Sequence, residues 1–352
     1  MDDVHARRRR FAAEARAERP DLALLCLLLA GEAEPDLGEA GLDAAQIELD
    51  RLAGLLPYRP ADGARGWARA VADLLGDRCG FHGVPADYRR LESSLLPDVL
   101  RRRRGLPILL SVVWMEVARR AGAPVHGVAL PGHFVVGFGD PEAYGRGPGA
   151  DGPGLEADGR GPGADGPGLE ADGRELGADS HRPGGGDLGP GAGSEAAPEA
   201  YGREAAETYG QGAAGTYGRP VLVDPFDRGR VLTDSDADLL VVGATGAPLD
   251  PSMLRPADPR DIVLRILNNI RAWAAARPER SDVALWAVDL SLLLPSHPAR
   301  LRYDRAQLLV QRGDFATGAA EMEAYAEVVA AVDEEAAESL HQQAFAARAL
   351  LN

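Results

Sequence analysis

The sequence predicts an α+β protein in which helices precede and follow a small antiparallel sheet. Apolar residues recur at helical spacing over most of 1–100 and again over 261–352. Short runs rich in β-branched residues lie between them, at 125–130, 133–138 and 221–223. These runs are too short for helices and are bounded by Gly and Pro, so we expect strands.

A change of composition divides the chain into parts. At about 150 residues per domain, 352 residues predict about two domains. We expect one domain built from 1–139 together with 219–260, of which 1–100 is a helical lead-in. Residues 140–218 form an insertion in it, and 261–352 a separate helical module.

Composition and charge exclude several classes of protein. No run of apolar residues is long enough to span a membrane, so we expect no membrane contact. Two cysteines exclude a disulfide scaffold and suit a reducing cytoplasm. The net charge of −16 argues against nucleic acid as a partner. No zinc spacing and no glycine-rich nucleotide motif occurs, so we expect neither a metal nor a cofactor.

All 38 basic residues are arginine, which is typical of codon bias in a GC-rich genome. The abundance of arginine is therefore no functional signal. Within the lead-in, the run Arg101–Arg104 is interpreted as a solvated helix end rather than as a phosphate site. The expected lead-in segments are a helix capped by Asp21, helices over 44–56 and 66–75, a break at 79–83 and a short segment over 91–100.

The insertion is a decaying tandem repeat. Residues 145–158 read GRGPGADGPGLEAD, and 159–172 repeat them letter for letter. Residues 140–218 hold 23 of the 43 glycines, and 15 acidic residues against five arginines give them a charge of −10. Such a segment buries too little apolar surface to offset its chain entropy, so we expect it to be disordered. Neither the collagen period nor that of calcium-binding nonapeptides is present.

The densest signal lies between Gly105 and Phe138. Pro107 suits the first position of a helix over 108–121, because the N–H that proline lacks is unpaired there. Two strands follow, at 125–130 and 133–138. A third is expected at 221–224, with a turn and the returning strand Val231–Leu232 behind it.

The C-terminal module is expected to be a set of helices. Asp261 is predicted to cap one helix, and Ser281 to open the next. Helices over 301–312 and 315–329 are expected to pack as a hairpin joined at Gly313-Asp314. Ala306, Ala319 and Ala320 would permit their close approach, and this pattern resembles a tetratricopeptide hairpin.

Four features in chain order resemble the papain-like core of the transglutaminase-like superfamily. They are a helix entered through Gly-x-x, a strand, a His that opens the next strand and an Asp that closes a third. Within this superfamily, PGHFVV at 131–136 and VDPF at 223–226 resemble the bacterial SirB-type family, as does the lead-in FHG at 81–83. His133 and Asp224 are 91 positions apart, so removing the 79-residue insertion leaves a separation of 12.

The resemblance implies a Cys-His-Asp triad, with the cysteine at the helix N-terminus, where the helix dipole favours the thiolate. His133 and Asp224 occupy the histidine-like and aspartate-like positions. Pro107 stands where the cysteine belongs, so the attacking atom is missing. Ser111, one helical turn further on, and Cys79 are the possible substitutes. His82 and His126 are interpreted as ordinary core or surface histidines.

Two functional hypotheses follow. In the first, the domain is catalytically degenerate and the protein acts by binding or regulation, with a protein or peptide partner held by the helical module or by the pocket at Pro107 and His133. In the second, Ser111 or Cys79 acts with His133 and Asp224 in a hydrolase or acyl transferase. The arrangement of side chains around His133 discriminates between them.

Overall fold

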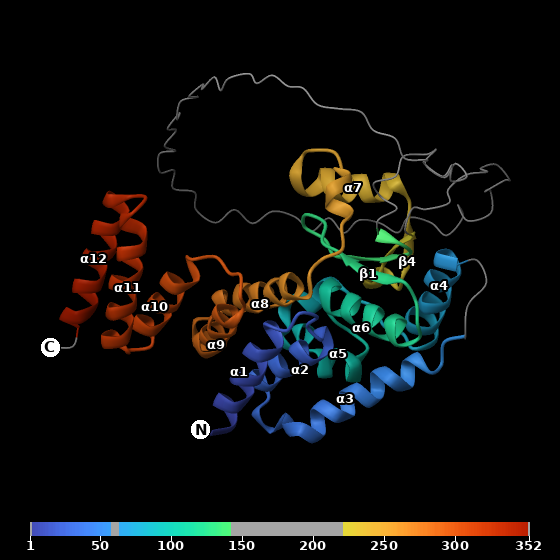
Figure 1. The fold of residues 1–352 in the computed structure, drawn as a ribbon, viewed down its shortest axis with the longest axis horizontal. Coiled ribbons are helices and arrows are strands. Elements are labelled where there is room, and N and C mark those ends of the chain that lie inside the picture. The colour runs from blue at the N-terminus through green and yellow to red at the C-terminus, as the bar shows by residue number, and fades with distance from the viewer. Residues whose placement is uncertain (1, 58–62, 142–220, 351–352) are drawn as a thin grey trace, which may run out of the picture. The chain divides into compact units, whose positions relative to one another are not determined.

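A computed structural model describes residues 2–57, 63–141 and 221–350, in which helices surround a four-stranded antiparallel sheet (Figure 1). The predicted insertion lies outside the described residues from position 142 onward, so its predicted disorder stays a prediction. Within the described residues, no helix is both long and apolar enough to cross a membrane.

The α-helices and strands follow one another in a simple order. The helices are α1 (Asp2–Ala15), α2 (Leu22–Ala33), α3 (Gly38–Ala53), α4 (Gly63–Val71), α5 (Leu96–Arg102), α6 (Pro107–Arg120), α7 (Asp234–Thr245), α8 (Pro259–Ala275), α9 (Ser281–Leu293), α10 (Leu301–Gln311), α11 (Phe315–Ala330) and α12 (Glu334–Ala349). The strands are β1 (Val125–Val128), β2 (Val135–Phe138), β3 (Val221–Asp224) and β4 (Arg230–Leu232).

The three predicted lead-in helices are present with different ends, and α1, which was not predicted, precedes them. Asp21 caps α2 as predicted, because its side chain accepts from the Leu24 N–H at 2.9 Å. Helix α3 begins at Gly38, six residues before the predicted start, because a turn beginning at Pro35 leads straight into it. Helix α4 widens into a π-type segment, Ala72–Arg78, which the apolar period did not reveal.

Helices cover both faces of the sheet. Its strands run in the order β1-β2-β3-β4 and are all antiparallel neighbours. Val136 and Val223 point into the main core, which includes α6, whereas Val135 and Leu222 pack with α7. Helix α7 was not predicted, because Val241 is among its few buried residues and it lacks a clear apolar period. The first two strands are each shorter than predicted, since the chain turns between them.

The C-terminal helices fall into two packing groups. Helices α8 and α9 contribute to the same hydrophobic core as α2 and α6. Asp258, rather than the predicted Asp261, caps α8, accepting from the Arg260 N–H at 2.7 Å. Helices α10 to α12 share a separate cluster. The predicted turn at Gly313-Asp314 is present, but Ala320 is exposed and Gly318 makes the close approach to α10.

The arginines at the end of α5 are not the solvated group that we expected. Arg102 and Arg104 both form ion pairs with the buried carboxylate of Asp87, at 3.4 and 3.1 Å. Arg103 binds Glu48 at 2.7 Å, and Arg101 pairs with Asp98. The two pairs with Asp87 hold the segment before α5 against its end, and the pair with Glu48 joins that end to α3. The expectation failed because the partner carboxylates lie 15 to 55 positions away for Arg102, Arg103 and Arg104.

Candidate functional site

The N-terminus of α6 carries Pro107 at its first position, as the sequence predicts. The residue is buried, and the preceding N–H of Leu106 donates to the carbonyl of Ser93 at 2.9 Å. Proline offers no hydrogen-bond donor and no nucleophile at this helix start. The start of α6 therefore lacks the thiol that the family resemblance implies at this position.

His133 and Asp224 are brought together at the end of the sheet. His133 lies in the turn two residues before β2, and Asp224 is the last residue of β3. The Nε2 atom of His133 lies 3.1 Å from Oδ2 of Asp224, so the contact between the two side chains is as predicted. The catalytic role of this His133–Asp224 pair remains a prediction.

The local backbone orients the carboxylate. Oδ1 of Asp224 accepts from the N–H of Phe226 at 2.9 Å, which leaves Oδ2 for the imidazole. Because an ionised carboxylate only accepts, a neutral His133 must carry its proton on Nε2. Nδ1 is then left as an acceptor, and no described residue donates to it. Asp224 is buried and the imidazole is 19% exposed, so the free nitrogen is reachable from solvent.

Two further side chains complete the surroundings of the pair, and neither was predicted to be a site residue. Arg265 of α8 donates to the carbonyl oxygens of Leu130 at 3.2 Å and of His133 at 2.9 Å. Tyr88 packs against Phe226, with ring centroids 6.2 Å apart. Burial, together with the nearby charge of Asp224, raises the pKa of the Tyr88 hydroxyl. Arg265 lies more than 130 positions from its acceptors, and no local pattern marks it.

The two candidate substitutes for the missing nucleophile lie elsewhere. Ser111 is fully buried, and its hydroxyl faces the carbonyl oxygen of Phe134 at 3.5 Å rather than the imidazole of His133. Cys79 is half-buried and follows directly on the π-type segment. Neither side chain makes a described contact with the His133–Asp224 pair.

His82 and His126 do not join the pair. The Nδ1 atom of His82 lies 2.8 Å from the carbonyl oxygen of Gly80. His126 is buried in β1, and desolvation lowers its pKa to about 4. Among the described residues, no group of three or more His, Cys, Asp or Glu side chains could hold a metal ion. The chemistry available at the pair is proton exchange at Nδ1 of His133.

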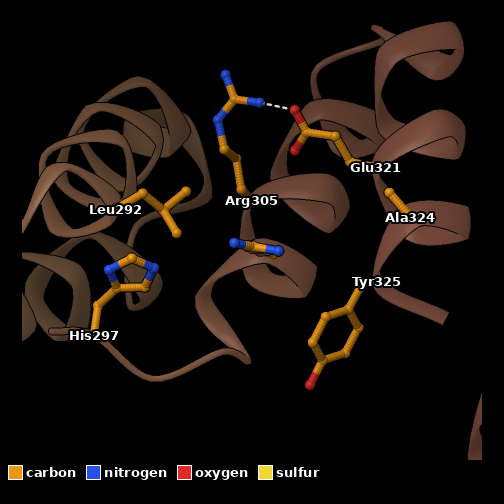
Figure 2. Close-up of a pocket in the computed structure, with 7 residues that line it drawn as sticks. Leu292, His297, Arg305, Glu321, Ala324 and Tyr325 are labelled. Atoms are coloured by element: carbon orange, nitrogen blue, oxygen red, sulfur yellow. Dashed lines mark hydrogen bonds and ion pairs between the residues drawn. The ribbon is translucent and has the colours of Figure 1, made fainter. Parts of the chain in front are cut away.

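A second candidate site is a cavity of about 340 Å³ in the helical module. Figure 2 shows Leu292 and His297 on one side and Ala324 and Tyr325 on the other. The Arg305–Glu321 ion pair lies at one end. Arg305 also donates to the carboxylate of Asp289 at 2.6 Å. Arg302 also lines the cavity and has no described ion-pair partner. The site therefore combines an apolar wall with an unpaired cation.

Two family models match successive parts of the chain. A model described as transglutaminase-like superfamily matches residues 43–145 and 210–268, and one described as tetratricopeptide repeat matches 270–352. No solved structure matches the chain.

Similar proteins cover only part of the chain. A UPF0162 protein of Xylella fastidiosa is 45% identical over 67 residues, 19% of this chain and 24% of its own length. F-box only protein 21 of Mus musculus is 36% identical over 67 residues, again 19% of this chain but 11% of its own. A UPF0162 protein of Pseudomonas aeruginosa is 52% identical over 44 residues, 12% of this chain and 16% of its own. The chain thus spans a quarter or less of these relatives. It combines a transglutaminase-like domain with a C-terminal tetratricopeptide-repeat module.

Proposed function

We propose that this protein recognises a protein or peptide partner, in a regulatory role in the cytoplasm, and that its transglutaminase-like domain is catalytically degenerate. One observation carries the proposal: Pro107 occupies the first position of α6, where active superfamily members are expected to have the nucleophilic cysteine. A helix N-terminus activates a thiol through its dipole and free N–H groups, and proline has neither a thiol nor an N–H. The strand motifs around His133 and Asp224 support placing the domain in the SirB-type branch.

The cysteines of the chain support the same proposal. Cys26 lies fully buried in α2, where desolvation strongly raises the pKa of its thiol, so it is inert. Cys79 contacts neither His133 nor Asp224 among the described residues. A thiol needs a base within hydrogen-bond reach to act as the nucleophile of a triad, and neither cysteine meets that requirement.

The helical module supports recognition as the remaining activity. Tetratricopeptide units stack to form concave surfaces that bind other proteins. The cavity in this module offers the apolar walls and unpaired cation that such recognition uses.

Electrophile labelling tests whether the domain is degenerate. The full chain is treated at neutral pH with iodoacetamide and, separately, with a fluorophosphonate, and modified residues are located by mass spectrometry. We expect slow labelling of Cys79, like an ordinary thiol, and none of Ser111. Rapid labelling of either residue that His133→Ala abolishes would instead support the hydrolase or acyl transferase, for which the intact His133–Asp224 pair is the favourable observation.

Restoring the thiol is the complementary experiment. In a Cys79→Ser background, Pro107→Cys places a thiol at the start of α6, and a helix does not require proline there. We expect the new thiol to titrate below the ordinary value of about 8.5 and to react faster than Cys79 does. Adding His133→Ala should slow this reaction. An unreactive Cys at 107 in a folded variant would refute the assignment of Pro107 to the nucleophile position.

A further inference from the structure

A second cavity, of about 350 Å³, lies where the segment Tyr88–Ser94 faces helix α8. Arg89 and Arg90 line it from the segment, and Trp273 and Arg277 line it from α8. Leu106, the residue before Pro107, also lines it. Tyr88 belongs to this cavity and also packs on Phe226, two positions beyond Asp224. The cavity therefore adjoins the His133–Asp224 pair.

The cavity has an uncompensated positive charge. None of the three arginines that line it has a described carboxylate partner, and no acidic residue among those described lines the cavity. Arg277 donates only to two backbone carbonyls, those of Trp273 at 2.7 Å and Arg89 at 3.2 Å. The whole chain has 54 acidic residues against 38 arginines, and each arginine of the nearby 101–104 run is ion-paired. Three arginines without a carboxylate at one cavity leave room for an anionic ligand.

The walls of the cavity are held in place before any ligand binds. The indole N–H of Trp273 donates to the carbonyl of Arg89 at 2.9 Å, and the guanidinium of Arg277 stacks 4.4 Å from the Trp273 ring centroid. Behind the segment, the buried Asp87 is bound by Arg104 at 3.1 Å and accepts from the Val84 N–H at 2.9 Å. A preorganised site loses less conformational entropy on binding.

Ser94 also lines the cavity and is 3% exposed as a residue. Its hydroxyl forms no hydrogen bond with any described residue, so it can bond with a hydrogen-bonding group that a ligand offers at this wall.

We propose that this cavity binds an acidic segment of a peptide partner. A ligand carboxylate lies against Arg89, Arg90 and Arg277, whose planar guanidinium groups bind carboxylates through paired hydrogen bonds. A neighbouring apolar side chain packs on Trp273 and Leu106, and the peptide main chain reaches Ser94. The net charge of −16 disfavours a polyanion such as nucleic acid, because the rest of the surface would repel it. The inference rests on the proposed recognition function and adds the class of partner and its site.

A peptide-selection experiment on the full chain tests the inference. The probe is a bead library of hexapeptides in which each position holds Glu, Asp, Gln, Asn, Leu or Phe, and bound beads are sequenced. We expect enrichment of peptides that contain Glu or Asp next to Leu or Phe. Selected peptides, labelled with fluorescein, are then titrated by fluorescence anisotropy against the unmodified chain and its variants. Arg90→Gln with Arg277→Gln should weaken binding at least tenfold, and Ser94→Ala about threefold or more.

Controls separate this inference from the proposed function. Arg19→Gln removes an exposed positive charge that lines neither of the two cavities and should leave the affinity unchanged. Circular dichroism and thermal unfolding show whether each variant is folded, and Ser94→Ala serves as the mild variant if the double variant is not. Binding that falls with Arg302→Gln, in the cavity of the helical module, but not with the variants of this cavity would overturn this inference and leave the recognition function standing.

Three other outcomes would also overturn the inference of an acidic peptide ligand. Enrichment of the Gln and Asn peptides over the acidic ones would overturn the charge argument. If no peptide binds at all, the inference fails, whereas the labelling experiments decide separately whether the domain is degenerate. Inorganic phosphate and an unlabelled acidic peptide are compared as competitors of the labelled peptide. If phosphate displaces the labelled peptide as effectively as the unlabelled peptide does, the site is a general anion site, and the inference of a peptide ligand is wrong.

Discussion

At the scale of single residues, the contact between His126 and Gly137 shows how closely the sheet is packed. The two residues are register partners on β1 and β2. A Cβ atom built on Gly137 would lie 2.5 Å from Nε2 of His126, which is too close for two non-bonded atoms. The imidazole therefore occupies the space that a side chain at 137 would need.

Gly137→Ala should destabilise the protein by about 1–3 kcal/mol, because overpacking a tight core forces side chains to move. The free energy of unfolding in urea measures this cost. In a His126→Ala background, the same substitution should cost less than half as much, because the atoms that clash are gone. An equal cost in both backgrounds would show that the imidazole is not what excludes the methyl group.

The buried imidazole also predicts a pH dependence of stability. Desolvation lowers the pKa of His126 from 6.5 to about 4, so the native state holds it neutral while the unfolded chain takes up a proton below 6.5. Its contribution to stability is complete above pH 6.5 and is lost as the pH falls toward 4, by about 2–3 kcal/mol in all. His126→Gln, which does not titrate, should flatten the stability curve in this window. A slope identical to that of the unmodified protein would contradict the assignment.

At the scale of helices and strands, two glycines in helices differ in how closely other atoms surround them. Gly318 of α11 lies against α10, where an added Cβ would be 2.6 Å from Cγ2 of Val310 and 2.9 Å from the carbonyl oxygen of Ala306. Gly243 of α7 has no atom within 4 Å of such a Cβ. The same substitution at the two positions separates packing from helix propensity.

Gly318→Ala should destabilise the helical module by about 1–3 kcal/mol, because a carbonyl oxygen on the neighbouring helix cannot move aside. Gly243→Ala should instead stabilise α7 by about 0.5–1 kcal/mol, since alanine loses less backbone entropy than glycine. Thermal unfolding followed by circular dichroism compares the two variants. Stabilisation by both substitutions would show that α10 and α11 do not approach as closely as the structure has them.

At the scale of the whole molecule, the sheet is continuous across the insertion. Phe138 of β2 pairs directly with Val221 of β3, although 82 residues lie between them in sequence. The two strands that carry the His133–Asp224 pair therefore meet without any described contribution from the intervening segment. A short connection can join them as a hairpin, because paired neighbours lie about 5 Å apart.

Replacing residues 142–220 with a short Gly-Ser linker should leave the melting temperature within a few degrees of that of the full chain. The replacement removes no described contact and shortens the loop that folding must close. Differential scanning calorimetry measures the change. A fall of more than about ten degrees, which corresponds to several kcal/mol for a protein of this size, would show that the insertion packs on the core.

The sequence predicted the parts of the site that depend on local pattern and strand order. Pro107 at a helix start follows from one glycine-bounded motif, and the contact of His133 with Asp224 follows from register once the insertion is removed. The ionic groups were not predictable in this way. Arg104 pairs with Asp87, and Arg265 binds the carbonyl of His133, through contacts that no spacing in the chain specifies.

The sequence by itself determined that helices flank a small sheet, that a proline opens α6 and that a helical hairpin turns at Gly313, because helix caps, turns and apolar periods act over a few residues. Only the tertiary structure decided that α7 covers the second face of the sheet and that α8 forms a cavity with the segment after Asp87. The physical reason is that such contacts join distant residues: Trp273 donates to Arg89 across 184 positions. Their geometry depends on how whole helices pack, which no local pattern of side chains encodes.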